Sequence, residues 1–136
     1  MVEYFSIQNP NTLILRVVNV SESTSTRLEL VPETAPVQIS LRELDASFKV
    51  RAHKHPNKKL FADKPIEAWI IFSGTVQANI FESNGTQICS VTLNKMDVAI
   101  FFDGGHSLEV VNNPVTMLEI KTGPYEGIKN DKIFID

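Results

Sequence analysis

The chain of 136 residues holds a single cysteine, three histidines, six glycines and one tryptophan. One cysteine cannot form an internal disulfide, so a reducing, cytoplasmic setting is expected. No apolar run approaches the ~20 residues of a membrane-spanning helix, and the first residues lack the basic and apolar regions of a signal peptide. The 13 basic and 16 acidic residues give a formal net charge of −3 without a basic cluster. Duplex nucleic acid usually requires a basic face, so neither nucleic acid nor a membrane is an expected partner.

Helical periodicity is also scarce, whereas short segments of alternating or β-branched residues recur along the chain. The expected strands cover residues 12–18, 27–31, 37–41, 68–72, 75–81, 87–93, 98–102, 107–111 and 115–121. Asn84-Gly85 separates two of them and predicts a hairpin, because both residues readily adopt positive φ. The pattern predicts an all-β barrel or sandwich with little or no helix. A hydrophobic content of 43% suits a single domain over residues 1–136.

The three histidines occupy positions that suit one metal ion. His53 and His55 form a His-x-His pair in a stretch that reads as a strand, so both rings are expected on one face. Glu67 opens the next apolar strand, and His106 follows a Gly-Gly turn. Three imidazoles and a carboxylate, without a thiolate, favour one divalent ion of Fe, Mn, Ni, Co, Zn or Cu. A pair whose rings simply face water would instead leave the fold free of metal.

The order of these residues resembles the cupin family. The family's first motif is a glycine, five residues, His-x-His, three or four residues, a glutamate, six residues and a glycine. Here the corresponding series is Ser47, five residues, His53-Lys54-His55, eleven residues, Glu67, six residues and Gly74. The interval over residues 56–66 is longer than in the family and forms either a lid over the cavity or a solvated loop.

The second motif of the family corresponds to residues 96–106, with Met96 in place of the initial glycine and Gly104-Gly105-His106 at the end. The resemblance implies a cupin-type jelly-roll barrel, also called a double-stranded β-helix, over residues 37–122. Residues 1–36 would supply N-terminal strands at a homodimer interface, and residues 123–136 a C-terminal segment. The implied metal ligands are His53, His55, Glu67 and His106.

Strand alternation also predicts what lines the cavity. Residues two positions from a ligand share its face, so Leu108 and Val110 are expected to give an apolar wall. The candidate substrate-binding residues are Arg51, Trp69, Lys121 and Tyr125. Arg51 either orients an anionic substrate or pairs with a structural carboxylate such as Glu119 or Asp97. Cys89 lies in an alternating strand and is expected in the core rather than as a nucleophile.

The late segment Lys121-Thr122-Gly123-Pro124-Tyr125 is similar to one found in small, single-domain bacterial cupins. That resemblance implies a link to surface-polysaccharide biosynthesis, with an undefined reaction. One expected function is a small metalloenzyme, of the dioxygenase or sugar isomerase/epimerase type, acting on a polar, carboxylate or sugar-derived molecule. The other is a non-catalytic module that binds or senses a sugar or carboxylate. With all three histidines as ligands, none is left as a general base, and this disfavours histidine-dependent epimerisation.

Overall fold

A computed structural model of the protein describes residues 1–22, 27–44, 46, 48–55, 64–123 and 132–135. The elements in these residues are β1 (Val2–Phe5), β2 (Leu13–Asn19), the 3-10 turn η1 (Val20–Glu22), β3 (Arg27–Glu29), β4 (Ser40–Arg42), β5 (Glu67–Phe81), β6 (Gln87–Leu93), β7 (Asp97–Phe101) and β8 (Gly105–Lys121). The predicted all-β architecture is confirmed. Within the described residues, no helix is long and apolar enough to cross a membrane.

Six of the strands form one antiparallel sheet, and β3 and β4 form a separate two-stranded ribbon. The path through the large sheet is β1-β2-β7-β5-β6, and β8 pairs with β5. The hairpin predicted at Asn84-Gly85 joins β5 to β6 and is confirmed, with Ala78 opposite Val91. Gly85 has the positive φ, 89°, that such a turn favours.

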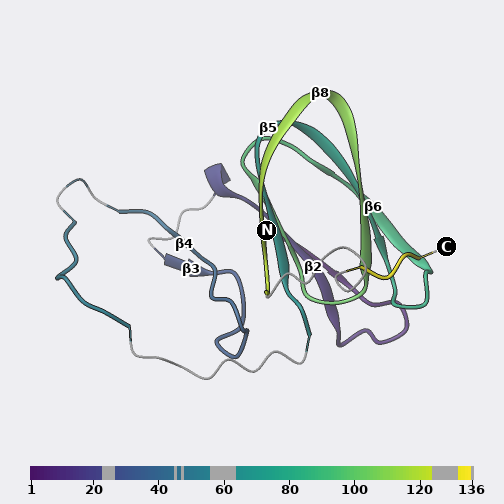
Figure 1. Ribbon diagram of the computed structural model, residues 1–136, viewed down its shortest axis with the longest axis horizontal. Helices are drawn as coiled ribbons and strands as arrows, with labels where there is room; N and C mark the ends of the chain where they lie inside the picture. The colour runs from purple at the N-terminus through teal and green to yellow at the C-terminus, as the bar shows by residue number, and fades with distance from the viewer. Residues whose placement is uncertain (23–26, 45, 47, 56–63, 124–131, 136) are drawn as a thin grey trace.

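Strands β5 and β8 are long, and they fold over together (Figure 1). The sequence pattern predicts two strands in each place, and this is wrong because the ladder bends without breaking. Its register shifts between Ile71 and Val76, and Gly74 lies there with φ 81°. A bulge of this kind bends a strand and turns its two halves into different layers. The first layer holds β1, β2, β7 and the start of β5, and the second holds β6 and the end of β5.

Apolar side chains fill the space between the two layers. The fully buried ones include Leu15 from β2, Ile71, Val76 and Ile80 from β5, and Leu93 from β6. Cys89 is partly buried against this cluster, and burial raises the pKa of its thiol. A thiol with a raised pKa is a poor nucleophile, which agrees with the predicted core position.

The outer face of the first layer carries a second apolar cluster. Ala68, Val98 and Ile100 point to this face, and Leu28 and Leu41 from the β3–β4 ribbon pack against it. The first layer is therefore covered on both faces, and the ribbon closes only the outer one.

Residues 43–55, of which 45 and 47 are not described, form a segment that we name the arm. The arm leads away from the layered body (Figure 1), and none of its described residues lies in a strand. The predicted strand through His53 and His55 is therefore wrong in this structure. A strand needs a neighbouring edge to satisfy its backbone groups, and no strand pairs with the described part of the arm. The described residues accordingly make a folded sheet that is open along β8, and not a closed barrel.

Candidate functional site

Glu67 and His106 lie 39 positions apart in the sequence and meet at one end of the layered body. Glu67 is the first residue of β5 in the first layer, and His106 is opposite Ile80 at the start of β8 in the second layer. Their Oε1 and Nε2 atoms are 3.5 Å apart. Their side chains keep 19% and 25% of their exposure, so the pair is accessible from solvent. The fold of β5 and β8 at Gly74 is what brings these two strand ends together.

Aromatic rings hold the imidazole of His106 on two sides. The ring of Phe101 lies 4.2 Å from it, centroid to centroid, and that of Trp69 lies 5.0 Å away at 90°. Trp69 also donates its indole N–H to Glu67 Oε1 at 2.6 Å. These contacts restrict the rotamers of both polar side chains, so the pair is preorganised.

Glu119, which the sequence suggested as a partner for Arg51, forms a hydrogen bond with Glu67 instead. Partial burial favours the neutral form of Glu67, but hydrogen bonds with His106, Glu119 and Trp69 outweigh it and lower its pKa to about 2. The hydrogen bond with Glu67 raises the pKa of Glu119, and burial adds to this, while Lys121 and Lys132 act in the opposite direction. The hydrogen bond between the two carboxyl groups therefore moves their pKa values apart, down for Glu67 and up for Glu119.

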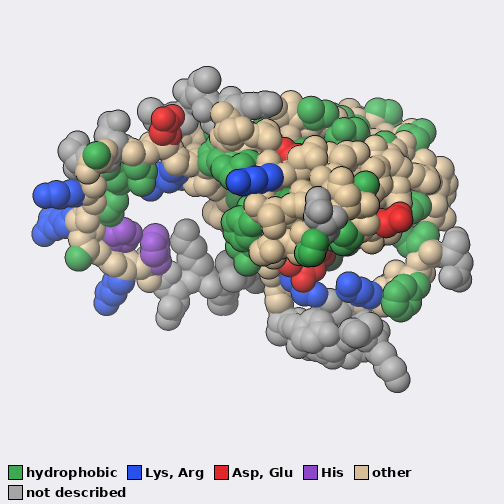
Figure 2. All heavy atoms as spheres, turned by 90° about the horizontal axis from the view of Figure 1, so that it is seen from above, with side chains coloured by type: hydrophobic (Ala, Val, Ile, Leu, Met, Phe, Trp, Pro, Cys, Tyr) green, Lys and Arg blue, Asp and Glu red, His purple; other side chains and the backbone are tan. Residues whose placement is uncertain are grey.

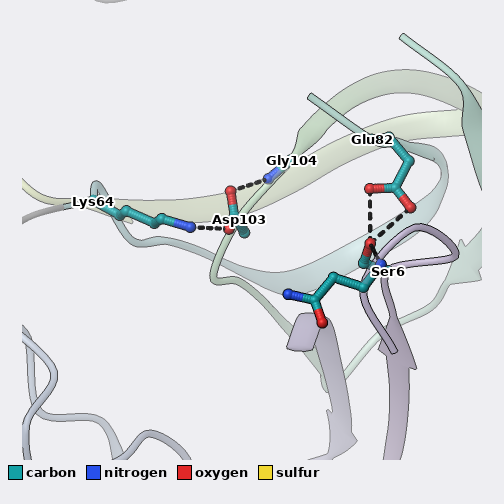
Figure 3. A network of polar contacts seen from close by, with 6 residues as sticks. Ser6, Lys64, Glu82, Asp103 and Gly104 are labelled. Atoms are coloured by element: carbon teal, nitrogen blue, oxygen red, sulfur yellow. Dashed lines mark hydrogen bonds and ion pairs between the residues drawn. The ribbon is translucent and has the colours of Figure 1, made fainter. Parts of the chain in front are cut away.

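A cavity of about 250 Å³ opens beside the pair. Its lining includes Lys64, Glu67, Phe101, Phe102, Asp103 and His106. Lys64 forms an ion pair with Asp103, which also accepts a hydrogen bond from the Gly104 N–H at 2.8 Å (Figure 3). Partial burial raises the pKa of Asp103, but the Lys64 and Gly104 hydrogen bonds outweigh it, so the net shift is downward. The lining of the cavity therefore combines one cation, two carboxylates and two phenylalanine side chains.

The buried carboxylate of Glu82 holds the end of β5 against the residues that follow β1. Glu82, just after β5, accepts hydrogen bonds from the hydroxyl of Ser6 at 2.9 and 3.0 Å (Figure 3). It also accepts one from the backbone N–H of Ile7 at 2.6 Å. Hydrogen bonds from the chain itself satisfy the carboxylate of Glu82, so we assign this residue a structural role.

His53 and His55 lie on the arm, and both are exposed. Their rings are 5.1 Å apart, centroid to centroid, and His53 Nδ1 lies 2.9 Å from the Arg51 carbonyl oxygen. Figure 2 shows lysine, arginine and histidine side chains gathered on the lobe that the arm forms at the left. Within the described residues, no hydrogen bond or ion pair joins this part of the arm to the body.

The four residues expected to hold a metal thus form two pairs: Glu67 with His106, and His53 with His55. Among the described residues, no three histidine, cysteine, aspartate or glutamate side chains gather in a way that would hold a metal ion. The pair of Glu67 and His106, which we name the inner pair, nonetheless has suitable spacing. Two ligands that each bind a metal ion at about 2.1 Å lie roughly 3–4 Å from one another. The donor types fit a divalent transition metal, and two more donors are needed to complete a stable site.

The expected substrate-binding residues occupy different regions. Trp69 is 4% exposed and faces the inner pair, and Lys121 lies opposite Glu67 across the β5–β8 ladder. Arg51 is exposed on the arm. Asp97, one of the carboxylates considered for it, accepts instead from Asn19 Nδ2 at 2.8 Å and from the Asn94 backbone. Tyr125 lies outside the described residues.

Sequence reasoning missed the position of Phe101 in this site and the pairing of Lys64 with Asp103. Phe101 ends β7, and its opposition to Glu67 follows from the β5–β7 register, which spacing along the chain does not reveal. The Asp103-Gly104 step carried a weak signal, because a short acidic residue before a glycine often turns the chain at the mouth of a site.

Comparison with protein-family models, with curated proteins and with solved structures finds no match to this chain. The resemblance to cupins therefore depends on the motif residues and their order.

Proposed function

We propose that this protein binds one divalent transition metal through Glu67, His106, His53 and His55, in a cupin-type jelly roll. The observation that supports this most is the 3.5 Å approach of Glu67 Oε1 to His106 Nε2 at an accessible cavity. Two side chains selected from the order of the motif residues alone are neighbours in space. A structural ion pair would not need the cavity beside it.

The proposal requires the arm to lie against the inner pair, so that the two histidine side chains supply the remaining donors. Imidazole and carboxylate are ligands for Fe, Mn, Ni, Co, Zn or Cu, and the donor set does not select one of them. When bound, such an ion would supply Lewis acidity toward an oxygen of the ligand. Trp69 would orient Glu67 from behind through its indole N–H.

The substrate that fits this proposal is a small polar molecule with a carboxylate or sugar-like hydroxyl groups. A cavity of about 250 Å³ is small for an organic ligand. Lys64 in the lining can bind an anionic or hydroxyl-rich end of a ligand by exchanging its partner Asp103 for that ligand. Phe101 and Phe102 also line the cavity, and aromatic side chains suit the apolar face of a sugar ring.

We infer a small metalloenzyme of the dioxygenase or sugar isomerase/epimerase type as the first candidate. Glu119 supports it, because a carboxyl group hydrogen-bonded to a proposed metal ligand can donate a proton to a bound molecule or accept one from it. The second candidate is a non-catalytic module that binds a sugar or carboxylate. The use of all three histidines as ligands supports this candidate, since no imidazole remains for acid–base chemistry.

Elemental analysis of protein purified without a metal-affinity column tests the proposal. We expect close to one ion per chain in the wild type and a metal content near zero in His106→Ala and in Glu67→Gln, because each variant removes one proposed ligand. Glu109→Gln is the matched control, because Glu109 is an exposed carboxylate of β8 opposite Gln77 and away from the cavity. Equal metal content in Glu67→Gln and Glu109→Gln would contradict the proposal.

A further inference from the structure

Residues 132–135, which we name the strap, lie across the layered body beside the inner pair. A Cβ atom on Gly105 would overlap Cδ1 of Ile135, so the Ile135 side chain rests directly on the Gly105 backbone. At the other end of the strap, Lys132 lies close enough to the Glu119 carboxyl group to act against the rise in its pKa that the hydrogen bond with Glu67 causes. The strap is thus held at two points, one apolar and one charged.

These two points belong to different layers. Gly105 is opposite Phe81 in the second layer, and Glu119 is opposite Trp69 in the first. Three residues of extended chain span about 10 Å, and two packed sheets lie about 10 Å apart. The strap therefore has the length that is needed to bridge the layers from one half of β8 to the other. Figure 1 shows it in yellow beside the label C, away from the fold of β5 and β8.

The ends of the strap flank the two members of the inner pair. His106 directly follows Gly105 in β8. Glu119 forms a hydrogen bond with Glu67. Of the described residues, those that line the cavity include no part of the strap and neither Gly105 nor Glu119. The strap and the cavity therefore lie on different sides of the inner pair.

The middle of the strap is held loosely. Ile133 and Phe134 are 96% and 79% exposed, and Ile135 keeps 40% of its exposure. None of these residues lies in a strand. A segment that buries so little apolar surface opens at a low free-energy cost. Beside it, Leu108 and Val110 are exposed on β8, so displacement of the strap would extend an opening that is already apolar.

We propose that the strap is a movable cover, whose displacement opens the β8 side of the inner pair. With the strap in place, a ligand reaches the pair through the cavity, whose volume of about 250 Å³ is small for an organic molecule. With the strap displaced, a larger sugar-derived or carboxylate molecule can reach the pair as well. The kind of ligand rests on the proposed function, whereas the position and movement of the strap can be tested without metal.

Two cysteines can fix the strap reversibly. A Cβ atom on Gly105 would lie 3.6 Å from Cγ1 of Ile135, and the Cβ atoms of a disulfide lie about 3.5–4.5 Å apart. Gly105→Cys and Ile135→Cys are therefore combined in a Cys89→Ser background. Mild oxidation of the folded protein should form a disulfide within one chain, and reduction should release it. Failure of this disulfide to form in the folded protein would overturn the inference.

The reaction of His106 with diethyl pyrocarbonate measures access to the inner pair in the two forms. Mass spectrometry of the separate peptides gives the rate for His106, and the exposed His53 and His55 on the arm serve as the internal reference. We expect His106 to react about threefold more slowly in the oxidised form than in the reduced form, with no change at the reference residues. Equal rates at His106 in the two forms would overturn the inference.

A single substitution tests the same cover without a cross-link. Ile135→Ala removes the apolar contact with Gly105, and we expect His106 to react faster than in the wild type, with the fold retained. Ile133→Ala is the matched control, because its side chain is almost fully exposed. The same rate at His106 in both variants would overturn the inference. A wild type that binds no metal would overturn the proposed function, and the rates measured at His106 would stand separately.

Discussion

Gly74 lies at the bend of β5 and β8, where one added methyl group should destabilise the protein. Its φ of 81° costs an L-residue about 1–2 kcal/mol. A Cβ at Gly74 would lie 2.7 Å from Val115 Cγ2 and 2.9 Å from the Pro114 carbonyl oxygen. The Val115 side chain can move, but the carbonyl belongs to the β8 backbone, so the overlap adds roughly 1–2 kcal/mol. We expect Gly74→Ala to lower the free energy of unfolding by about 2–4 kcal/mol in urea denaturation.

Gly85→Ala is the control for this measurement. Gly85 has a similar φ of 89°, but it lies in the hairpin turn between β5 and β6 and not at the fold of β5 over β8. Its cost should stay near the backbone component alone, about 1–2 kcal/mol. Because the bend at Gly74 brings Glu67 to His106, only Gly74→Ala should also weaken metal binding. Equal losses of stability in the two variants would refute the assigned role of Gly74.

Three further predictions concern single side chains. Met96 has φ 72° and is 38% exposed, so Met96→Gly should raise the free energy of unfolding by about 0.5–1 kcal/mol, whereas Met96→Val should lower it. The pKa of Glu67 is lowered to about 2, so its contribution is present above about pH 4.5 and is lost as the pH falls toward 2. This contribution is roughly 1–2 kcal/mol after a discount for solvent screening, and acid titration of Glu67→Gln should lack it. The raised pKa of Glu119 has the opposite sign, because its ionisation opposes folding; Glu119→Gln should therefore stabilise the protein at neutral pH but not at pH 3, as denaturation at the two values will report.

The sequence was informative wherever a residue pattern acts locally. Residues 87–93 alternate, and β6 has those bounds; Asn84-Gly85 predicts the turn that precedes it. Met96, which stands where the cupin motif has a glycine, adopts the positive φ that a glycine would favour. These features depend on a few neighbouring residues, so composition and spacing reveal them.

The sequence was less informative where tertiary contacts decide. Alternation could not distinguish two strands from one bent strand at Gly74, since a bulge keeps the pattern on both sides. The arm has a strand-like pattern around Val50, yet a strand forms only where an edge is available to it. Glu119 was considered as a partner for Arg51 and not for Glu67, because Glu67 is its neighbour only through the β5–β8 ladder, 52 positions away in the sequence.

Trp69 can report metal binding between Glu67 and His106, because it is the single tryptophan and it contacts both side chains. We propose titrating Co²⁺ into the metal-free protein while recording its fluorescence and the visible absorption of the ion. We expect quenching that saturates at one ion per chain, together with new absorption bands, and the loss of both in His106→Ala. Fluorescence that does not respond, or a response that persists unchanged in His106→Ala, would contradict it.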